Sequence, residues 1–139
     1  MTDLERARAA FSGDRFASEL VGCVIDEVGP GYARCSLRLG AQHLNLLGRP
    51  MGGVIYTLAD FAYAVASNFG RDTFVTTSSE IHFLAPATGD TLVAEARQIR
   101  FGRRTCLFEI SVTDGAGTNI AYATESGMLV QNEKGSTVP

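Results

Sequence analysis

Residues 50–70 read PMGGVIYTLADFAYAVASNFG, and this stretch decides the fold. It is rich in Ala, Leu, Val and aromatic residues, and Asp60 is its only charged residue. The pattern predicts a helix from Val54 to Phe69, and a helix that is apolar on every side must be buried. The segment is too short and too interrupted for a membrane span, where a mid-helix Asp would also be costly. The rest of the chain must therefore supply a surface that covers this helix on most sides.

The segments on either side of the helix predict one curved antiparallel sheet. Before it, a Gly-Pro-Gly turn joins two strands in a hairpin; after it, the apolar period changes to two and short turns separate four strands. Short turns between consecutive strands are typical of antiparallel pairing, and a strongly curved sheet can wrap around one apolar helix. The predicted elements are a short helix at Thr2–Phe11, strands at Leu20–Val28, Tyr32–Leu39, Thr73–Ala85, Thr91–Ile99, Thr105–Thr113 and Asn119–Val130, and a loop at Gly40–Met51. We expect an α+β protein with a single domain over residues 1–139, an N-terminal helical segment at 1–13 and a frayed tail at 131–139.

Composition restricts the class of protein further. Hydrophobic residues make up 45% of the 139 residues and charged residues 19%, which predicts a packed core and excludes a disordered chain. The net charge of −3 argues against binding to bulk nucleic acid. The N-terminus is charged and helical in character, with no visible signal peptide, so we expect a cytoplasmic protein without a membrane partner.

The cysteines and histidines predict neither a disulfide framework nor a metal site. Cys23, Cys35 and Cys106 are odd in number and widely spaced, and they alternate with apolar residues as buried small side chains do. His43 and His82 lack the spacing of metal ligands, and no serine-nucleophile, Walker or dinucleotide-binding motif is present. We therefore expect no cofactor.

A cluster of arginines stands out on this acidic chain. Four of the 12 basic residues fall in one short stretch, at Arg97, Arg100, Arg103 and Arg104. Arginine forks match phosphate oxygens in pairs, so the cluster suggests a small anionic ligand. A solvated strand and turn would account for the same residues.

Asp60 is the first candidate for chemistry. A lone carboxylate on a buried helix costs several kcal/mol unless it is paired or functional. It is either a base or nucleophile in a tuned environment, or a structural residue that bonds a neighbour at a subunit interface.

Gly52 and Gly53 open the predicted helix and allow two interpretations. They can provide a tight entry turn. Alternatively, the missing side chains let a substrate approach free backbone N–H groups, which together with the helix dipole stabilise developing negative charge. Gly53 and Asp60 are seven residues apart, about 10 Å along a helix axis, so one carbonyl cannot touch both on the same helix. If both act on one substrate, they come from two subunits with antiparallel helices, as a two-fold dimer provides.

Polar residues flank the helix on both sides. Asn45, in the loop before the glycines, could orient water or a carbonyl, but an Asn in a turn commonly bonds local backbone. Thr76, Thr77 and Ser78 begin the strand after the helix, where a hydroxyl could bond water or Asp60, although Thr is ordinary on a strand face.

Taken together, these residues resemble the signature of the PaaI-type acyl-CoA thioesterases. That family is related to the 4-hydroxybenzoyl-CoA thioesterases and has the hotdog fold, a curved antiparallel sheet around one long central helix. The family pattern is approximately N-x-x-G-x-x-H-G-G followed by a helix with L-x-D. The matching stretches are HLNLLGRPMGG (43–53), LAD (58–60), IHFLAP (81–86), GD (89–90) and GRRT (102–105), and the resemblance extends from about Leu20 to Val130.

The resemblance implies a role for each matching residue. Asp60 matches the acidic nucleophile or general base, and Gly53 the backbone N–H on the opposing subunit that polarises the thioester carbonyl. Asn45 matches the residue that holds water or substrate, and Thr77, or failing that Thr76, an assisting hydroxyl. The substrate-binding positions that it implies are Met51 and Gly52 at the helix entry and Gly102, Arg103 and Arg104 in a turn that contacts the nucleotide end of CoA.

One departure keeps a second function open. The family usually has His before the two glycines and this chain has Met51, whose thioether cannot donate a hydrogen bond. We expect hydrolysis of acyl-CoA to free acid and CoA by a homodimer, or a dimer of dimers, with shared sites. The alternative is a non-catalytic acyl-CoA-binding or regulatory hotdog protein. A hotdog dehydratase would need a His placed beside an acid, and neither His43 nor His82 provides that pairing.

Overall fold

The computed structural model describes residues 1–130. The tail predicted to fray, 131–139, lies outside the described residues. The elements are α1 (Asp3–Phe11), a π-helical turn η1 (Phe16–Val21), β1 (Val24–Gly29), β2 (Tyr32–Arg38), a 3-10 turn η2 (Ala41–His43), α2 (Gly52–Asn68), β3 (Phe74–Phe83), β4 (Thr91–Phe101), β5 (Thr105–Asp114) and β6 (Asn119–Leu129). None of the helices within residues 1–130 is long and apolar enough to span a membrane.

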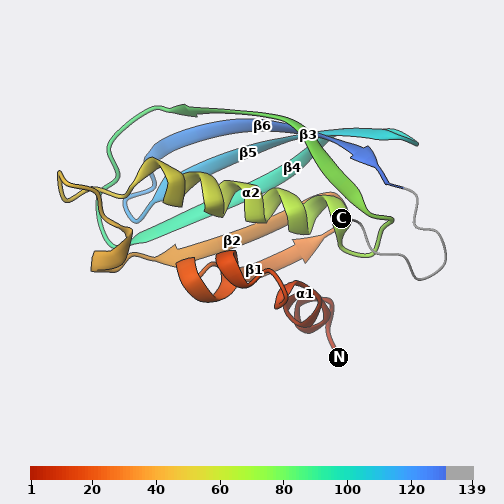
Figure 1. Cartoon of the computed structure of the whole chain (residues 1–139), viewed down its shortest axis with the longest axis horizontal. Helices are drawn as coiled ribbons and strands as arrows, with labels where there is room; N and C mark the ends of the chain where they lie inside the picture. Colours follow the sequence, from red (N-terminus) through yellow and green to blue (C-terminus); the bar gives the residue numbers. More distant parts are fainter. Residues whose placement is uncertain (131–139) are drawn as a thin grey trace.

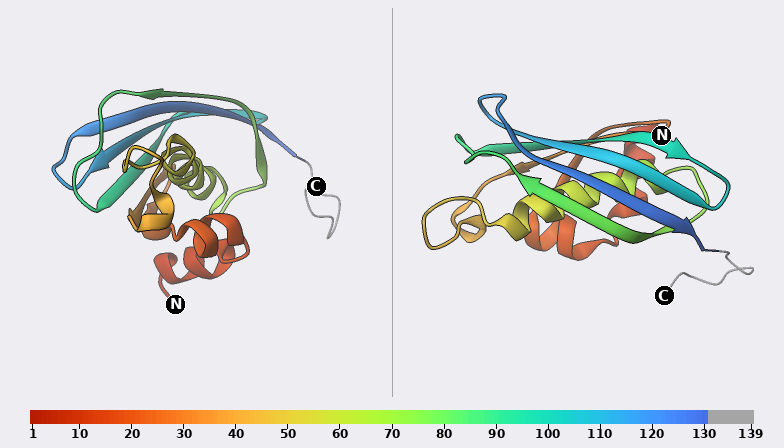
Figure 2. Two further views of the ribbon diagram at one scale, coloured as in Figure 1. Left: turned by 60° about the vertical axis from the view of Figure 1, so that its left-hand side comes forward. Right: turned by 90° about the horizontal axis from the view of Figure 1, so that it is seen from above.

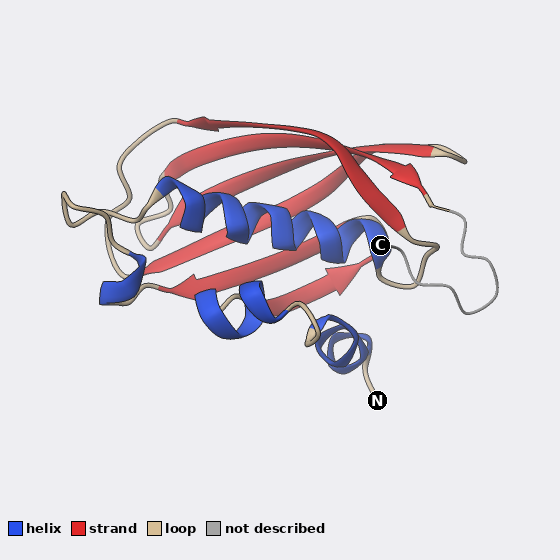
Figure 3. Cartoon of the chain, viewed as in Figure 1, coloured by secondary structure: helices blue, strands red, loops and turns tan. Residues whose placement is uncertain are grey.

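All six strands form one antiparallel sheet, in the order β1-β2-β4-β5-β6-β3 (Figure 3). The predicted α+β class and hotdog arrangement are confirmed. The sequence also indicated that the four strands after the helix follow one another as neighbours, and for β3 this is wrong. The chain leaves β3 at Phe83 and crosses to β4, so β3 forms the far edge and pairs only with β6.

Helix α2 lies along the concave face of the sheet (Figure 1). It packs chiefly against β2, β4 and β5, and η1 touches it from another side. Figure 2 shows the sheet arching over α2, with α1 and η1 on the side away from the arch. The predicted burial of the helix is therefore confirmed for most of its circumference, with buried side chains that include Leu58, Phe61 and Val65.

The N-terminal segment follows the sequence in one part and departs from it in another. Thr2 caps α1 in a reciprocal capping box with Glu5, as the polar start of that helix predicted. Leu20 and Val21 were predicted to begin a strand but lie in η1. His43 explains this end of η1: its Nδ1 accepts from the Gly40 N–H at 2.8 Å, so its Nε2 carries the proton and donates to the Val21 carbonyl at 2.6 Å.

All three cysteines are buried and free, as predicted. Burial raises the pKa of the Cys23 thiol to about 12, and the same cause raises the pKa of Cys35. Because the thiolate is the reactive form, Cys23 and Cys35 serve as small side chains of the core.

Gly127 fixes how closely the strands approach α2. A Cβ placed on this residue would collide with the Tyr63 hydroxyl and would lie 3.0 Å from the Val75 carbonyl and 3.1 Å from the Cys106 Sγ. The carbonyl belongs to the paired strand and cannot rotate away. Only a residue without a side chain fits between the helix and β6 at this point.

Gly127→Ala is therefore expected to destabilise the fold, by about 1–3 kcal/mol for a forced overpacking. The measurement is the free energy of unfolding in urea. Gly29→Ala is the matched control, because a Cβ at Gly29 meets nothing within 4 Å and its backbone is in an ordinary region. Equal stability of the two variants would contradict the packing described for Gly127.

Candidate active site

One stripe of α2 is left uncovered by the sheet and by η1. Gly53 and Asp60 are exposed along it, and Thr57 and Ala64 are partly exposed at the helical spacing between and beyond them. The sequence placed Asp60 on a buried helix, but its side chain lies on the uncovered stripe. The carboxylate is thus available to solvent or to a ligand instead of being sealed in the core.

Asp60 lines a pocket of about 600 Å³ between α2, β3 and the segment before β1. Its walls are mixed, with an apolar part from η1 and α2 and carboxylates from two elements. The lining residues are Asp14, Arg15, Phe16, Ala17, Tyr56, Thr57, Asp60, Phe61, Ala64 and Thr76. The pKa of Asp14 is raised, chiefly by burial and to a smaller extent by the negative charge of Asp60.

Glu125 is a second carboxyl group beside Asp60, and it is fully buried. It projects from β6 onto the helix face of the sheet, where Ser79 of β3 and Phe108 of β5 are its register partners. Burial, together with the neighbouring Asp60 carboxylate, raises the pKa of Glu125 from its ordinary 4.5 to about 9. Glu125 is therefore protonated at neutral pH.

A hydrogen bond from α2 organises the polar groups around Glu125. The Tyr56 hydroxyl, one helical turn before Asp60, donates to the Ser79 Oγ at 2.6 Å. Ser79 also lies beside the Glu125 carboxyl. Among residues 1–130, no donor reaches either oxygen of Glu125 with regular hydrogen-bond geometry.

The first turn of α2 presents free backbone donors. Val54 and Ile55 donate to the Met51 carbonyl, whereas the N–H groups of Gly52 and Gly53 have no hydrogen-bond partner among the described residues. A Cβ on Gly52 would lie 3.2 Å from the Phe83 ring, so packing within the chain accounts for this glycine. A Cβ on Gly53 would meet only the Met51 Cε, at 3.9 Å, and nothing in the described chain requires a glycine there.

Asn45 makes the local turn that was one of its two predicted roles. Its Oδ1 accepts from the N–H groups of Leu47 and Arg49, at 2.9 and 3.2 Å. It also lines a pocket of about 400 Å³ at the entry to α2, together with Gly52 and Phe83. The side-chain oxygen is thus occupied, and the amide N–H₂ is the group left for a ligand.

Thr76 and Thr77 of β3 have different surroundings. The register between β3 and β6 shifts between Thr76 and Ser78. Thr76 lines the Asp60 pocket. Thr77 instead bonds the Ser126 carbonyl and hydroxyl, each at 3.2 Å, and does not line that pocket. Of the two β3 threonines, Thr76 is the one that lines the Asp60 pocket in the same chain.

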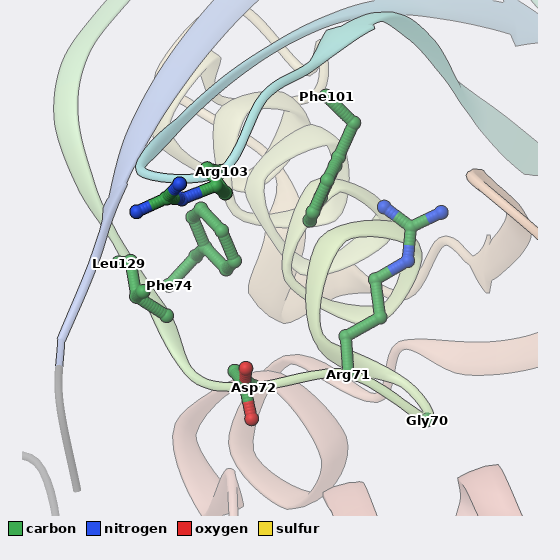
Figure 4. Close-up of a pocket in the computed structure, with 7 residues that line it drawn as sticks. All are labelled: Gly70, Arg71, Asp72, Phe74, Phe101, Arg103 and Leu129. Atoms are coloured by element: carbon green, nitrogen blue, oxygen red, sulfur yellow. The ribbon is translucent and has the colours of Figure 1, made fainter.

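The arginine cluster divides between structural and open positions. Arg97 pairs with Glu95 at 3.0 Å and stacks over the Tyr32 ring, so it belongs to the strand surface. Arg103, with Gly102 and Arg104 in the turn between β4 and β5, reaches a third pocket of about 530 Å³ near the C-terminal end of α2. Figure 4 shows Arg103 beside Phe74 in this pocket, with Arg71 and Phe101 on the opposite side; the Arg71 guanidinium stacks on Phe101 at 3.8 Å.

Apart from Thr77 on β3, the predicted site residues lie at three places along α2. Asn45 and Gly52, with the nearby Gly53 and Met51, are at its N-terminal tip; Asp60 is at mid-helix; Arg103 is near its far end. The Asp60 carboxylate and the free N–H donors of the helix tip, about 10 Å apart along α2, do not converge within one chain.

Comparison with known proteins agrees with this fold. The profile of the thioesterase superfamily matches residues 47–121, the segment that contains α2 and most of the sheet. The chain belongs to the thioesterase superfamily. Within it, the chain is 31% identical over 118 residues to the acyl-coenzyme A thioesterase PaaI of Escherichia coli K12, covering 84% of each sequence, and the prediction of a PaaI-type protein is confirmed.

Solved structures extend the likeness to the whole fold. The structure of E. coli PaaI superposes with a TM-score of 0.86 at 25% identity, covering 94% of this chain and 95% of that one. A protein of Streptococcus mutans UA159, crystallised with acetyl CoA, has a TM-score of 0.73 at 27% identity and covers 78% of this chain and 88% of its own.

Sequence reasoning missed Glu125, Tyr56 and Asp14. For Glu125 a signal was present, because Ala121, Ala123 and Gly127 share its alternation along β6 and mark the face that packs on the helix. A glutamate in that register must be buried. Tyr56 and Asp14 carried no such signal, since only the folded chain brings them to Asp60.

The raised pKa of Glu125 predicts a pH-dependent stability difference. Its proton is retained in the folded chain up to about pH 9 but is lost from the unfolded chain above about pH 4.5, so the folded state loses stability as pH rises between those values. Glu125→Gln cannot ionise. The free energy of unfolding of this variant, relative to the parent chain, is expected to rise from pH 5 to pH 9 by up to about 1.4 kcal/mol per pH unit.

Urea unfolding at several pH values measures this difference. Glu109→Gln is the matched control, because Glu109 lies on the outer face of the sheet and accepts from the Tyr122 hydroxyl. A difference for Glu125→Gln that stays flat with pH, like that of the control, would contradict the protonated state.

Proposed function

We propose that the chain hydrolyses acyl-CoA thioesters to free acid and CoA, at sites formed by two copies of the chain. The observation that carries the proposal is the pair of complementary half-sites on one helix: an exposed Asp60 in a pocket and unpartnered N–H groups at the tip. The substrate class is supported by the name of the E. coli relative, an acyl-CoA thioesterase, and by the acetyl CoA bound to the S. mutans protein.

The distance between the half-sites requires a second copy. Gly53 and Asp60 are about 10 Å apart along the axis of α2, too far for one thioester carbonyl. A two-fold axis that makes two α2 helices antiparallel brings the tip of one beside the Asp60 of the other and creates two equal sites. The tip carries the exposed Leu46, Leu47 and Met51, and the far wall of the Asp60 pocket carries Phe16, which is 61% exposed. Such apolar surfaces are typical of interfaces.

The chemistry follows from these groups. The Gly53 N–H and the positive end of the α2 dipole stabilise the oxyanion that forms when the thioester carbonyl is attacked. Asp60 of the other copy either removes a proton from the attacking water or attacks the carbonyl itself to form an anhydride that water then cleaves. In both routes the C–S bond breaks, the acid is released and the CoA sulfur leaves as a thiol after protonation.

The remaining predicted residues serve binding in this proposal. The Asn45 amide N–H₂ holds water or the substrate carbonyl, and Thr76 is a better partner for Asp60 in its own chain than Thr77. Gly102, Arg103 and Arg104 receive the nucleotide end of CoA, since guanidinium forks bind phosphate oxygens in pairs.

Acyl-CoA binding without turnover is the second candidate, and Met51 favours it. Its thioether Cε lies beside Gly53, where a donor would assist the carbonyl, and a thioether has no proton to donate. A thiol-release assay over short, medium, long and aromatic acyl-CoAs separates the two functions. We expect release with at least one class; tight binding throughout the panel with no release would favour the second candidate.

Asp60→Asn tests the carboxylate. The variant keeps the size and shape of the side chain at an exposed position, so the fold and the affinity for acyl-CoA are expected to persist. The turnover number is expected to fall by about 10²–10⁴, the typical contribution of a positioned base or nucleophile. Turnover equal to that of the parent chain would remove Asp60 from the mechanism.

Gly53→Ala tests the approach to the helix tip. Because a Cβ there meets only the Met51 Cε, and Gly is about 1 kcal/mol less favourable than Ala in a helix, this variant is expected to be at least as stable as the parent chain. The kcat/KM is nevertheless expected to fall by about 10-fold or more, since the methyl group occupies the space of the thioester. Full activity in a stable Gly53→Ala chain would show that no substrate approaches this N–H.

A further inference from the structure

The Asp60 carboxylate has a buried neighbour that the proposed chemistry does not use. Glu125 is 0% exposed, projects from β6 toward α2 and lies beside Asp60 and Ser79. Its register partner on the other side is Phe108, which offers no hydrogen bond. Burying an ionised carboxyl group costs several kcal/mol unless the group is fully hydrogen-bonded. The presence of Glu125 at this buried position therefore calls for an explanation.

Counting donors and acceptors assigns the direction of each hydrogen bond. Tyr56 donates its proton to the Ser79 Oγ, so the Ser79 hydroxyl proton is available to the neighbouring Glu125 carboxyl, neither oxygen of which has a regular hydrogen bond among residues 1–130. Asp60, when ionised, can only accept. If Glu125 is protonated, its second oxygen can donate to Asp60, and a small side-chain adjustment gives every group from Tyr56 to Asp60 a partner. If Glu125 is ionised, two carboxylates face each other with no donor between them.

We infer that Glu125 is a positioning residue: as a neutral acid it donates a hydrogen bond to the Asp60 carboxylate and holds that carboxylate toward the pocket. In this arrangement Tyr56 of α2, Ser79 of β3 and Glu125 of β6 lie in sequence behind the Asp60 carboxylate. The inference rests on the proposed function, and it concerns how Asp60 is oriented.

The arrangement sets an alkaline limit on activity. Burial and the Asp60 carboxylate raise the pKa of Glu125 to about 9, and above that pH the donor is lost and a second negative charge appears next to Asp60. The other titratable groups around this pair are Asp14 in the pocket wall, Tyr56 and Tyr63 on α2, and Cys106 on β5. The pKa of Tyr63 is raised chiefly by burial and, to a smaller extent, by the hydrogen bond to Cys106. Tyr63 therefore stays neutral in the pH range where Glu125 titrates.

A direct measurement is an NMR titration of the side-chain carboxyl carbons in protein labelled with ¹³C-glutamate. The Glu125 signal is identified as the one that is missing from the spectrum of Glu125→Gln. In the parent chain the Glu125 signal is expected to titrate far above the exposed glutamates. In Asp60→Asn the midpoint is expected to move to lower pH, because the neighbouring charge is gone. A Glu125 signal that titrates with the exposed glutamates, or that ignores Asp60→Asn, would overturn the inference.

Turnover against pH supplies the second readout. Glu125→Gln keeps a neutral donor, so its kcat at pH 7 is expected within about 3-fold of the parent and its alkaline decline is expected to disappear. Glu125→Leu fits the apolar surroundings but cannot donate, and its kcat is expected to fall by about 10-fold or more with KM nearly unchanged. Glu109→Gln, on the outer face, is expected to match the parent chain throughout. A Glu125→Leu chain with the parent's kcat and pH profile would overturn the inference.

The two readouts separate the failure of the inference from the failure of the function. The parent chain could release no thiol while its Glu125 signal still titrates at high pH and responds to Asp60→Asn. That result would contradict the proposed function and support the interaction between Glu125 and Asp60. The parent chain could instead hydrolyse acyl-CoA while Glu125 titrates with the exposed glutamates and Glu125→Leu keeps full activity. That result would overturn the role of Glu125 and leave the proposed function standing.

Discussion

The packing of α2 into the concave face of the sheet is the constraint on which the other features depend. The helix is apolar on most sides because β2, β4 and β5 cover it, and η1 closes another side. What remains is one stripe, whose two exposed residues are a glycine at the tip, Gly53, and an aspartate at mid-helix, Asp60. The same burial that stabilises the fold therefore selects which side of the helix can meet a ligand or a second chain.

A second constraint operates behind Asp60. The Gly127 contact brings β6 close to α2, and Glu125, two residues before it on the same face, is left without water. Burial at this point, with the Asp60 carboxylate beside it, raises the pKa of Glu125 and favours its neutral form.

Much of this architecture could be predicted from the sequence. Particular residues show which features could not be. The helix, the antiparallel sheet and the buried cysteines follow from periodicity and turn residues, which act locally. The position of β3 at the far edge could not be predicted, because the segment after Phe83 is compatible with either a turn or a crossover. Asp60 and Gly53 were found as departures from an apolar pattern, whereas the Tyr56–Ser79 bond depends on tertiary contact between α2 and β3.

Whether one working site is built from two chains is tested most directly by subunit mixing. Asp60→Asn and Gly53→Ala chains are unfolded, mixed in equal amounts and refolded together, and turnover is compared with that of each variant alone. If sites are shared, a mixed dimer has one site with both changes and one site with neither, so random pairing restores about a quarter of the parent activity. Activity of the mixture no greater than the average of the two variants would contradict a site that joins Asp60 of one chain to Gly53 of another.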